Sequence, residues 1–242
     1  MRLHFRESSV DYRHYTFPYR VLAEKESSDT LASIYEQGFL PASNDYAEER
    51  ELFYLARSLR LDLRELGFDK KRRYLQHRGT ETGLHSNRLS IKELMASHPR
   101  WKESVIEWVE GRFQPPYMTS ERLEYILKRN FLTQCIATYC DTELVGITLL
   151  PHDAAIAHYW FVFYDPEWNP ERSLGKWILG DCGRLHQEQG FEYLYLGTCY
   201  TKTAAYKFQG IASGVEFYEG STWSDSIEEL QKRLTSDGLS SD

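Results

Sequence analysis

The chain has 242 residues, of which 41% are hydrophobic, 27% charged and 14% aromatic. This length predicts one large domain or two small ones, and the aromatic content excludes a chain that is disordered throughout. The apolar runs are much shorter than the ~20 residues that cross a bilayer, and no basic segment after Met1 leads into an apolar stretch. We therefore expect a cytoplasmic protein that is a monomer and has no membrane partner.

Four cysteines, Cys135, Cys140, Cys182 and Cys199, are scattered through the second half of the chain. They form no Cys-x-x-Cys pair, and the sequence has no His-x-x-x-His spacing. Metal sites need clustered ligands, so we expect no bound metal and buried, unpaired thiols.

Positive charge is concentrated in residues 57–78, although the whole chain has a net charge of −7. This window carries eight basic residues and three acidic ones, hence +5, and leaves −12 for the rest of the chain. The basic residues are Arg57, Arg60, Arg64, Lys70, Lys71, Arg72, Arg73 and Arg78. Such asymmetry indicates either an ordinary solvated helix or a surface for an anionic partner.

Apolar periodicity and capping residues predict the elements of the first half of the chain. They are an edge strand or hairpin in 1–20, a strand at 21–23, a helix over 31–37, a strand over 53–63, a basic turn or helix from 69, a linker over 79–90, and helices over 91–111 and 119–129.

The second half alternates strands and helices. The expected elements are a hairpin of strands 131–139 and 144–151, a long strand over 154–164, a helix over 173–189, a strand at 193–197, a short helix at 204–209 and a strand at 215–218. The strand–helix–strand unit from His158 to Gly197 predicts a parallel crossover. A ligand crevice should lie where its strands end, near Tyr164, Asp165 and Gly197.

This order of elements is similar to the GNAT acyltransferase fold. In acetyl-CoA users of that superfamily, a loop of the form [Q/R]-x-x-G-x-[G/A] holds the pyrophosphate at a helix N-terminus. The corresponding stretch here runs from Arg172 through Gly175 to Trp177. Since Trp177 occupies the position of a small residue, we expect it to crowd a pyrophosphate.

The same region resembles the C-terminal domain of the arginyl/leucyl-tRNA–protein transferases, the N-end rule aminoacyltransferases. The matching pieces are Tyr-Asp-Pro at 164–166, Ser-Leu-Gly at 173–175, Tyr-Leu-Tyr-Leu-Gly at 193–197, Tyr-Lys at 206–207 and a closing Trp223. The chain departs from that family in lacking its N-terminal cysteine cluster, and Phe-Gln-Gly follows the Tyr-Lys pair. The acceptor can therefore differ from the family's.

The resemblance implies transfer of an amino acid from an aminoacyl-tRNA to the α-amine of a protein or peptide. No cofactor is required, because the aminoacyl-tRNA is itself the co-substrate. Asp165 would hold or deprotonate the incoming ammonium, and Lys207 would contact the tRNA end or the oxyanion. The residues expected to bind tRNA are Arg172, Lys176, Lys70, Lys71, Arg72 and Arg73, and those expected to stack on the terminal adenine are Tyr164, Tyr195, Tyr200 and Tyr206.

Each assignment has a purely structural alternative. Asp165 can cap a turn before Pro166, Lys207 can be a solvated lysine, and the tyrosines can simply pack. His158 and Trp160 lie in mid-strand, and we assign them to the core.

The expected architecture is an α/β chain: a small N-terminal α+β domain (1–80), a GNAT-like transferase domain with a mixed sheet (90–224), and an acidic flexible tail (225–242). Two other functions remain open, an acyl-CoA-dependent N-acyltransferase of the same fold and a non-catalytic protein that binds a peptide or an RNA end.

Overall fold

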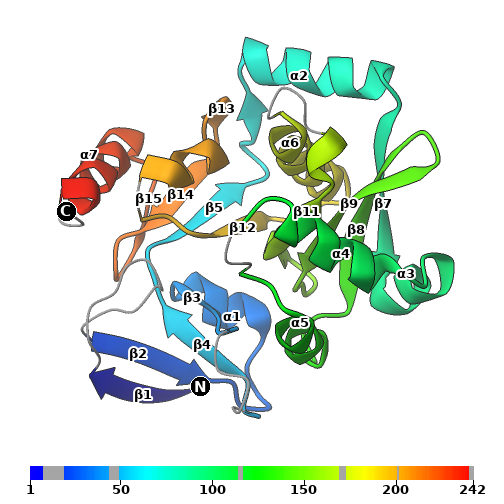
Figure 1. Ribbon diagram of the computed structural model, residues 1–242. Helices are drawn as coiled ribbons and strands as arrows, with labels where there is room; N and C mark the ends of the chain where they lie inside the picture. Colours follow the sequence, from blue (N-terminus) through cyan, green and yellow to red (C-terminus); the bar gives the residue numbers. More distant parts are fainter. Residues whose placement is uncertain (8–18, 44–48, 114–116, 169–172, 201, 240–242) are drawn as a thin grey trace.

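The computed structural model describes residues 1–7, 19–43, 49–113, 117–168, 173–200 and 202–239. Three main sheets with helices packed around them confirm the expected α/β class with a mixed sheet (Figure 1). Within these ranges, no helix combines the length and apolar character needed to cross a membrane.

The first sheet is antiparallel and is built from the N-terminal part of the chain. Its strands run in the order β1 (Arg2–Glu7), β2 (Tyr19–Glu24), β4 (Leu52–Leu55) and β3 (Phe39–Pro41). Helix α1 (Leu31–Glu36) begins at Thr30, whose side chain accepts a hydrogen bond from the backbone N–H of Ser33. The predicted helix is thus confirmed, and Thr30 is its N-cap.

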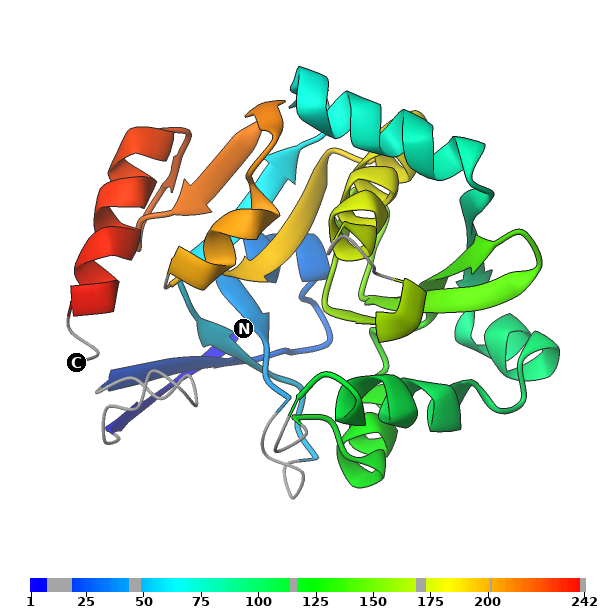
Figure 2. The ribbon, with the colours of Figure 1, turned by 45° about the horizontal axis from the view of Figure 1, so that its top comes forward.

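The second sheet is mixed and lies in the middle of the molecule (Figure 2). Its strands run in the order β10 (Ile156–His158), β12 (Tyr193–Thr198), β5 (Ser58–Asp62), β14 (Val215–Tyr218) and β15 (Trp223–Ser224). Strands β10 and β12 are parallel, as the crossover predicted, and the other pairs are antiparallel. A separate pair is formed by β13 (Ile211–Ser213) and β6 (Gly67–Phe68).

The third sheet is antiparallel, with the order β11 (Phe161–Tyr164), β9 (Glu143–Leu150), β8 (Gln134–Cys140) and β7 (Leu84–Ser90). The chain between β7 and β8 contains α3 (Ile91–Ser97), α4 (Trp101–Glu110) and α5 (Ser120–Leu127). Helix α6 (Leu174–Glu188) connects β11 to β12, and α2 (Lys70–Glu81) packs on it. The short 3-10 helices η2 (Pro166–Trp168) and η3 (Lys202–Lys207) follow the ends of β11 and β12.

Two strands that we expected to be continuous are each divided between sheets. The 53–63 run forms β4 and β5, which belong to the first and second sheets. The 154–164 run forms β10 and β11: the backbone N–H of Tyr159 still bonds to the second sheet, at Tyr195, whereas that of Trp160 bonds to Leu149 of the third. The apolar pattern does not change at these points, because both parts of each run contribute side chains to the hydrophobic core.

The expected linker over 79–90 is also wrong. Helix α2 continues to Glu81, and residues 84–90 form β7, which pairs with β8 from Leu84↔Cys140 to Ser90↔Gln134. Because β7 lies at the edge of its sheet, exposed residues such as His85 and Asn87 occupy positions along it. A polar edge strand of this kind resembles a loop in the sequence.

Where we expected a flexible tail, the structure has helix α7 (Ile227–Leu239). Leu230 and Leu234 on this helix are buried in the core beneath β14, and Asp237 pairs with Arg57 at 2.6 Å. The proposed division into domains 1–80 and 90–224 remains a prediction; β5 from the first range lies between β12 and β14 of the second.

Candidate functional site

The ends of β11 and β12 separate at the edge where we predicted a crevice. Strand β10, which comes before β11 in the chain, pairs in parallel with β12 over only three residues, and this pairing ends at His158↔Tyr195. Beyond that point β11 follows β9, while β12 follows β5 and pairs Gly197 with Leu59. The C-terminal ends of β11 and β12 therefore lie in different sheets. We take the place where these two strands separate as the candidate site.

A cluster of polar groups lies at the end of β12. The Nζ of Lys207, on η3, donates a 2.8 Å hydrogen bond to the carbonyl oxygen of Thr198. Gly197 has a φ of +78°, a conformation that favours glycine. A Cβ at Gly197 would lie 3.5 Å from the Nζ of Lys207 and 3.7 Å from the Nε2 of His158, so both nitrogens border the space beside this glycine.

Burial changes the ionisation of these groups. It lowers the pKa of Lys207 to about 8, and it lowers the pKa of His158 well below its ordinary value, with the charge of Lys207 acting in the same direction. Burial raises the pKa of the neighbouring Cys199 thiol to about 11. Near neutral pH, His158 and Cys199 are therefore uncharged, and Lys207 can lose its proton far more readily than an exposed lysine.

Asp165 follows β11, on the other side of the divergence. Its backbone N–H donates to the carbonyl oxygen of Val145, and its Oδ1 accepts a 2.8 Å hydrogen bond from the backbone N–H of Glu167. The carboxylate thus caps the turn into η2, which was the structural alternative for this residue. The described contacts of Asp165 and Lys207 have no residue in common, and the catalytic assignment of both remains a prediction.

The four tyrosines expected to bind the tRNA end lie in different surroundings. Tyr195 is buried against Tyr35 and Trp223, and its hydroxyl accepts a hydrogen bond from Arg60. The hydroxyl of Tyr200 accepts a 2.7 Å hydrogen bond from the backbone N–H of Arg57. By contrast, Tyr206 is 43% exposed beside Lys207.

The fourth tyrosine, Tyr164, is half-buried at the end of β11. The guanidinium of Arg112 lies 4.0 Å from its ring centroid. A Cβ at Gly175 would lie 2.9 Å from its hydroxyl oxygen, so Tyr164 also covers the first turn of α6. Of the four, Tyr206 is therefore the exposed one, Tyr164 and Tyr200 are half-buried, and Tyr195 is buried.

Much of the basic window serves the fold. Arg57 pairs with Asp237, Arg60 with Glu36 and Glu216, and Arg64 with Asp62. Arg72 is also buried, which differs from the surface position expected of a tRNA-binding residue. Its guanidinium donates to the carbonyl oxygens of Lys176 and Gln209, so it ties α2 to α6 and to the end of η3.

The remaining basic residues form the α2 basic face, which we define as Lys70, Lys71, Arg73, Tyr74 and Arg78. All five are exposed, and Tyr74 presents 62% of its surface. No described acid pairs with Lys70, Lys71 or Arg78. The hydrogen bonds of Arg72, which lies on the buried side of the helix, place the first turn of α2 beside α6 and the end of η3. Lys70, Lys71 and Arg73 are therefore exposed on the part of α2 that lies nearest to these two elements.

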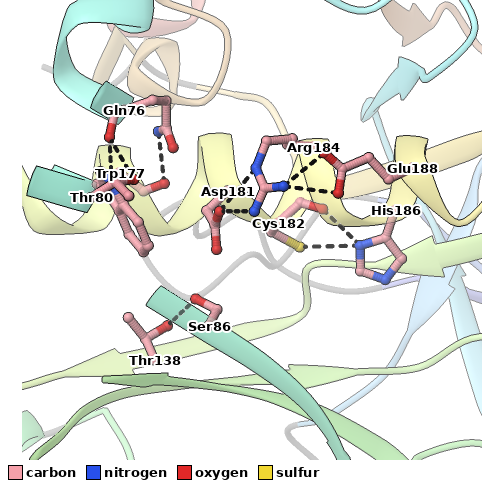
Figure 3. Close-up of polar contacts among 10 residues, drawn as sticks. All are labelled: Gln76, Thr80, Ser86, Thr138, Trp177, Asp181, Cys182, Arg184, His186 and Glu188. Carbon is pink, nitrogen blue, oxygen red and sulfur yellow. Dashed lines mark hydrogen bonds and ion pairs between the residues drawn. The ribbon is translucent and has the colours of Figure 1, made fainter. Parts of the chain in front are cut away.

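Trp177 does not crowd the start of α6, contrary to our expectation. Its side chain is 1% exposed, and its indole N–H donates to the carbonyl oxygen of Gln76 on α2 (Figure 3). It packs against Gly79, where a Cβ would lie 2.2 Å from the indole nitrogen. The large residue therefore fills the α2–α6 contact and leaves the helix N-terminus clear of its ring. Lys176 is half-buried on the same turn, while Arg172 lies outside the described residues.

His158 has one feature that the sequence did not reveal. It is 1% exposed, as the core assignment predicted, yet its Nε2 has no hydrogen-bond partner. A histidine within an apolar strand, ending opposite a Tyr-Leu-Gly segment, is the one signal that the sequence offers. In the described part of the chain, no group of three or more His, Cys, Asp or Glu side chains is placed to hold a metal ion.

Solved structures with low sequence identity were found by comparison. The C-terminal domain of a protein described as a lysylphosphatidylglycerol synthetase from Agrobacterium fabrum has 14% identity and a TM-score of 0.46, over 70% of this chain and 51% of that one. L-PGS from Bacillus licheniformis has 13% identity and a TM-score of 0.47, over 84% and 69%. An aminoglycoside acetyltransferase from an uncultured soil metagenomic sample has 19% identity and a TM-score of 0.37, over 53% and 85%.

The chain thus spans about half the length of the first of these structures. No curated protein sequence matches it significantly. The family model for the acetyltransferase (GNAT) domain matches residues 67–208, which is more than half of the chain and includes α2, α6, β12 and η3. The chain therefore belongs to the family of GNAT acetyltransferase domains.

Proposed function

We propose that this GNAT-type acyltransferase transfers the aminoacyl group of an aminoacyl-tRNA to the α-amine of a protein or peptide. The observation that carries the proposal is the exposed α2 basic face in a chain that is acidic as a whole, on a helix whose first turn is tied to α6 and to the end of η3. Cationic side chains with an exposed aromatic ring suit a nucleic-acid backbone and an unstacked base. The resemblance of 164–223 to the arginyl/leucyl-tRNA–protein transferases supports the same donor and an acceptor of the N-end rule type.

The chemistry requires little more than positioning and the removal of a proton. The amine nitrogen attacks the ester carbonyl, the bond to the 3′-terminal oxygen of the tRNA breaks, and an amide forms. One proton leaves the ammonium before the attack, and a second passes to the departing oxygen. Lys207 suits the first transfer because burial lowers its pKa to about 8, close to the working pH of a general base. Asp165 supplies a negative charge for the ammonium at the end of β11.

The proposal is tested with a pool of aminoacyl-tRNAs carrying labelled amino acids and a peptide with a free N-terminus. We expect label to enter the peptide, and none to enter its N-acetylated form. Lys207→Met and Asp165→Asn should lower turnover by about 10²–10⁴-fold, the usual contribution of acid–base catalysis. Lys202→Met, which removes an exposed lysine from the same 3-10 helix, is the matched control.

Transfer from an acyl-CoA donor is the second candidate function, and the position of the Trp177 side chain favours it. Its ring packs against α2, so Trp177 does not cover the backbone N–H groups of the first turn of α6, which a pyrophosphate would bind once the side chain of Tyr164 moves away from Gly175. Acetyl-CoA in place of the aminoacyl-tRNAs separates the two functions: acetylation without aminoacylation supports this candidate. Tight tRNA binding without transfer from either donor supports the third reading, a non-catalytic binding protein.

A further inference from the structure

The side chain of Tyr164 lies over the start of α6. This tyrosine ends β11, and its backbone pairs with Gly146 of β9, so the sheet fixes the position of its Cα atom. Its ring reaches Gly175 in the first turn of α6: a Cβ built on this glycine would lie 2.9 Å from the hydroxyl oxygen of Tyr164 and 3.1 Å from its Cε1 and Cζ atoms. These distances are shorter than an ordinary van der Waals contact. The tyrosine ring therefore fills the space in front of Gly175.

The covered turn is the part of α6 that a phosphate group would contact. The N–H of Trp177 closes this turn by donating to the carbonyl oxygen of Ser173. The N–H groups that come before it have no acceptor within the helix, and together with the helix dipole they attract anions. Gly175 is also the first glycine of the pattern that holds the pyrophosphate in acetyl-CoA users. A pyrophosphate and the ring of Tyr164 cannot occupy this place together.

Arg112, which follows α4, holds the ring of Tyr164 in this position. Its guanidinium lies 4.0 Å from the ring centroid of Tyr164 and 5.0 Å from that of Phe113, and all three side chains line a narrow hollow between the end of α4 and β11. In the described part of the chain, no carboxylate forms an ion pair with Arg112. A cation stacked on an aromatic ring at an exposed site changes an equilibrium by about two- to fivefold. The stacking therefore favours the closed position of Tyr164.

We propose that Tyr164 and Arg112 form a lid that keeps the pyrophosphate of an acyl-CoA away from the first turn of α6 and so selects the donor. This inference rests on the proposed transfer from aminoacyl-tRNA and names the residues that discriminate against the other donor. An acyl-CoA carries a pyrophosphate, which requires the open turn. The 3′ end of an aminoacyl-tRNA has none and leaves the lid closed. Tyr164 is thus a specificity-determining residue, and Arg112, which acts through it, is a positioning residue.

The experiment measures the binding of CoA to the wild type and to variants of the lid by isothermal titration calorimetry. Tyr164→Ala should tighten CoA binding by at least about tenfold, because the wild-type affinity is reduced by the fraction of molecules in which the turn is open. Tyr164→Phe keeps the ring and should bind CoA as weakly as the wild type. Arg112→Met should tighten binding by about two- to fivefold, although it removes a positive charge. The matched control is Arg100→Met, at the other end of α4, which should not tighten it.

Equal CoA affinity in the wild type and in Tyr164→Ala would overturn the proposal. Weaker binding in Arg112→Met would also contradict it, because Arg112 would then contact the anion instead of holding the ring. If Tyr164→Ala does not fold, the exposed Arg112→Met still provides the test. If CoA affinity rises in the variants but the wild type uses no aminoacyl-tRNA, the lid stands and the proposed donor is wrong. If aminoacyl transfer occurs while all variants bind CoA equally, the donor stands and the lid falls.

Discussion

The protonated side chain of Lys207 should destabilise the folded protein at neutral pH, so Lys207→Met should raise the free energy of unfolding there. Burial lowers the pKa of Lys207 from 10.5 to about 8. One pKa unit corresponds to about 1.4 kcal/mol, so protonated Lys207 costs the fold about 3 kcal/mol below pH 8. Between pH 8 and 10.5 the unfolded chain binds more protons than the folded one, and the wild-type stability rises with pH. Above 10.5 the penalty has disappeared.

The substitution also removes the hydrogen bond to Thr198, worth about 1 kcal/mol at any pH. The variant should therefore be about 2 kcal/mol more stable than the wild type at pH 7, and about 1 kcal/mol less stable at pH 10.5. Denaturant unfolding at both pH values gives the two differences, with Lys202→Met as the control for the loss of a charge. If the difference in unfolding free energy between the variant and the wild type is the same at both pH values, protonated Lys207 does not destabilise the folded protein.

Four further substitutions test the surroundings of the site and the packing of the helices. Arg72→Met should lower the free energy of unfolding by about 2–3 kcal/mol, because two hydrogen-bonded carbonyls lose a charged donor. Arg73→Glu should change the free energy of unfolding by no more than about 0.5 kcal/mol, and it should reduce the salt dependence of tRNA binding. Equal effects on stability would contradict the different roles of these two arginines. Gly79→Ala should cost about 1–3 kcal/mol by urea unfolding, since its methyl group would overlap the buried ring of Trp177; an unchanged midpoint would mean that α2 and α6 are not packed as described. Leu230→Ala should cost about 2–5 kcal/mol in the same assay, and a much smaller loss would restore the expectation of a flexible C-terminal segment.

The crossover and its helix could be predicted from the sequence, because apolar periodicity and the glycine after the helix are local signals. The division of 53–63 and 154–164 between sheets could not be predicted, because it depends on the strand with which each backbone group forms its hydrogen bond. The N–H of Tyr159 donates to the carbonyl oxygen of Tyr195, whereas that of Trp160 donates to the carbonyl oxygen of Leu149. A single apolar run provides no information about that choice.

The candidate site shows the same limit for side chains. Asp165, Tyr164 and Lys207 were placed at strand ends because the motifs and the topology rule agree there. The burial of Arg72 depends on carbonyls 104 and 137 residues away, and the surroundings of His158 include Tyr35, which lies 123 residues away in the sequence. Such relations between distant residues become visible only in three dimensions.

The mass added to an acceptor peptide, when aminoacyl-tRNAs and acetyl-CoA are offered together, shows which donor the protein uses. We predict the mass of an amino acid residue on the free α-amine, lost with Lys207→Met and retained with Lys202→Met. An acetyl group on the peptide, or an unmodified peptide, would contradict the proposed transfer from aminoacyl-tRNA.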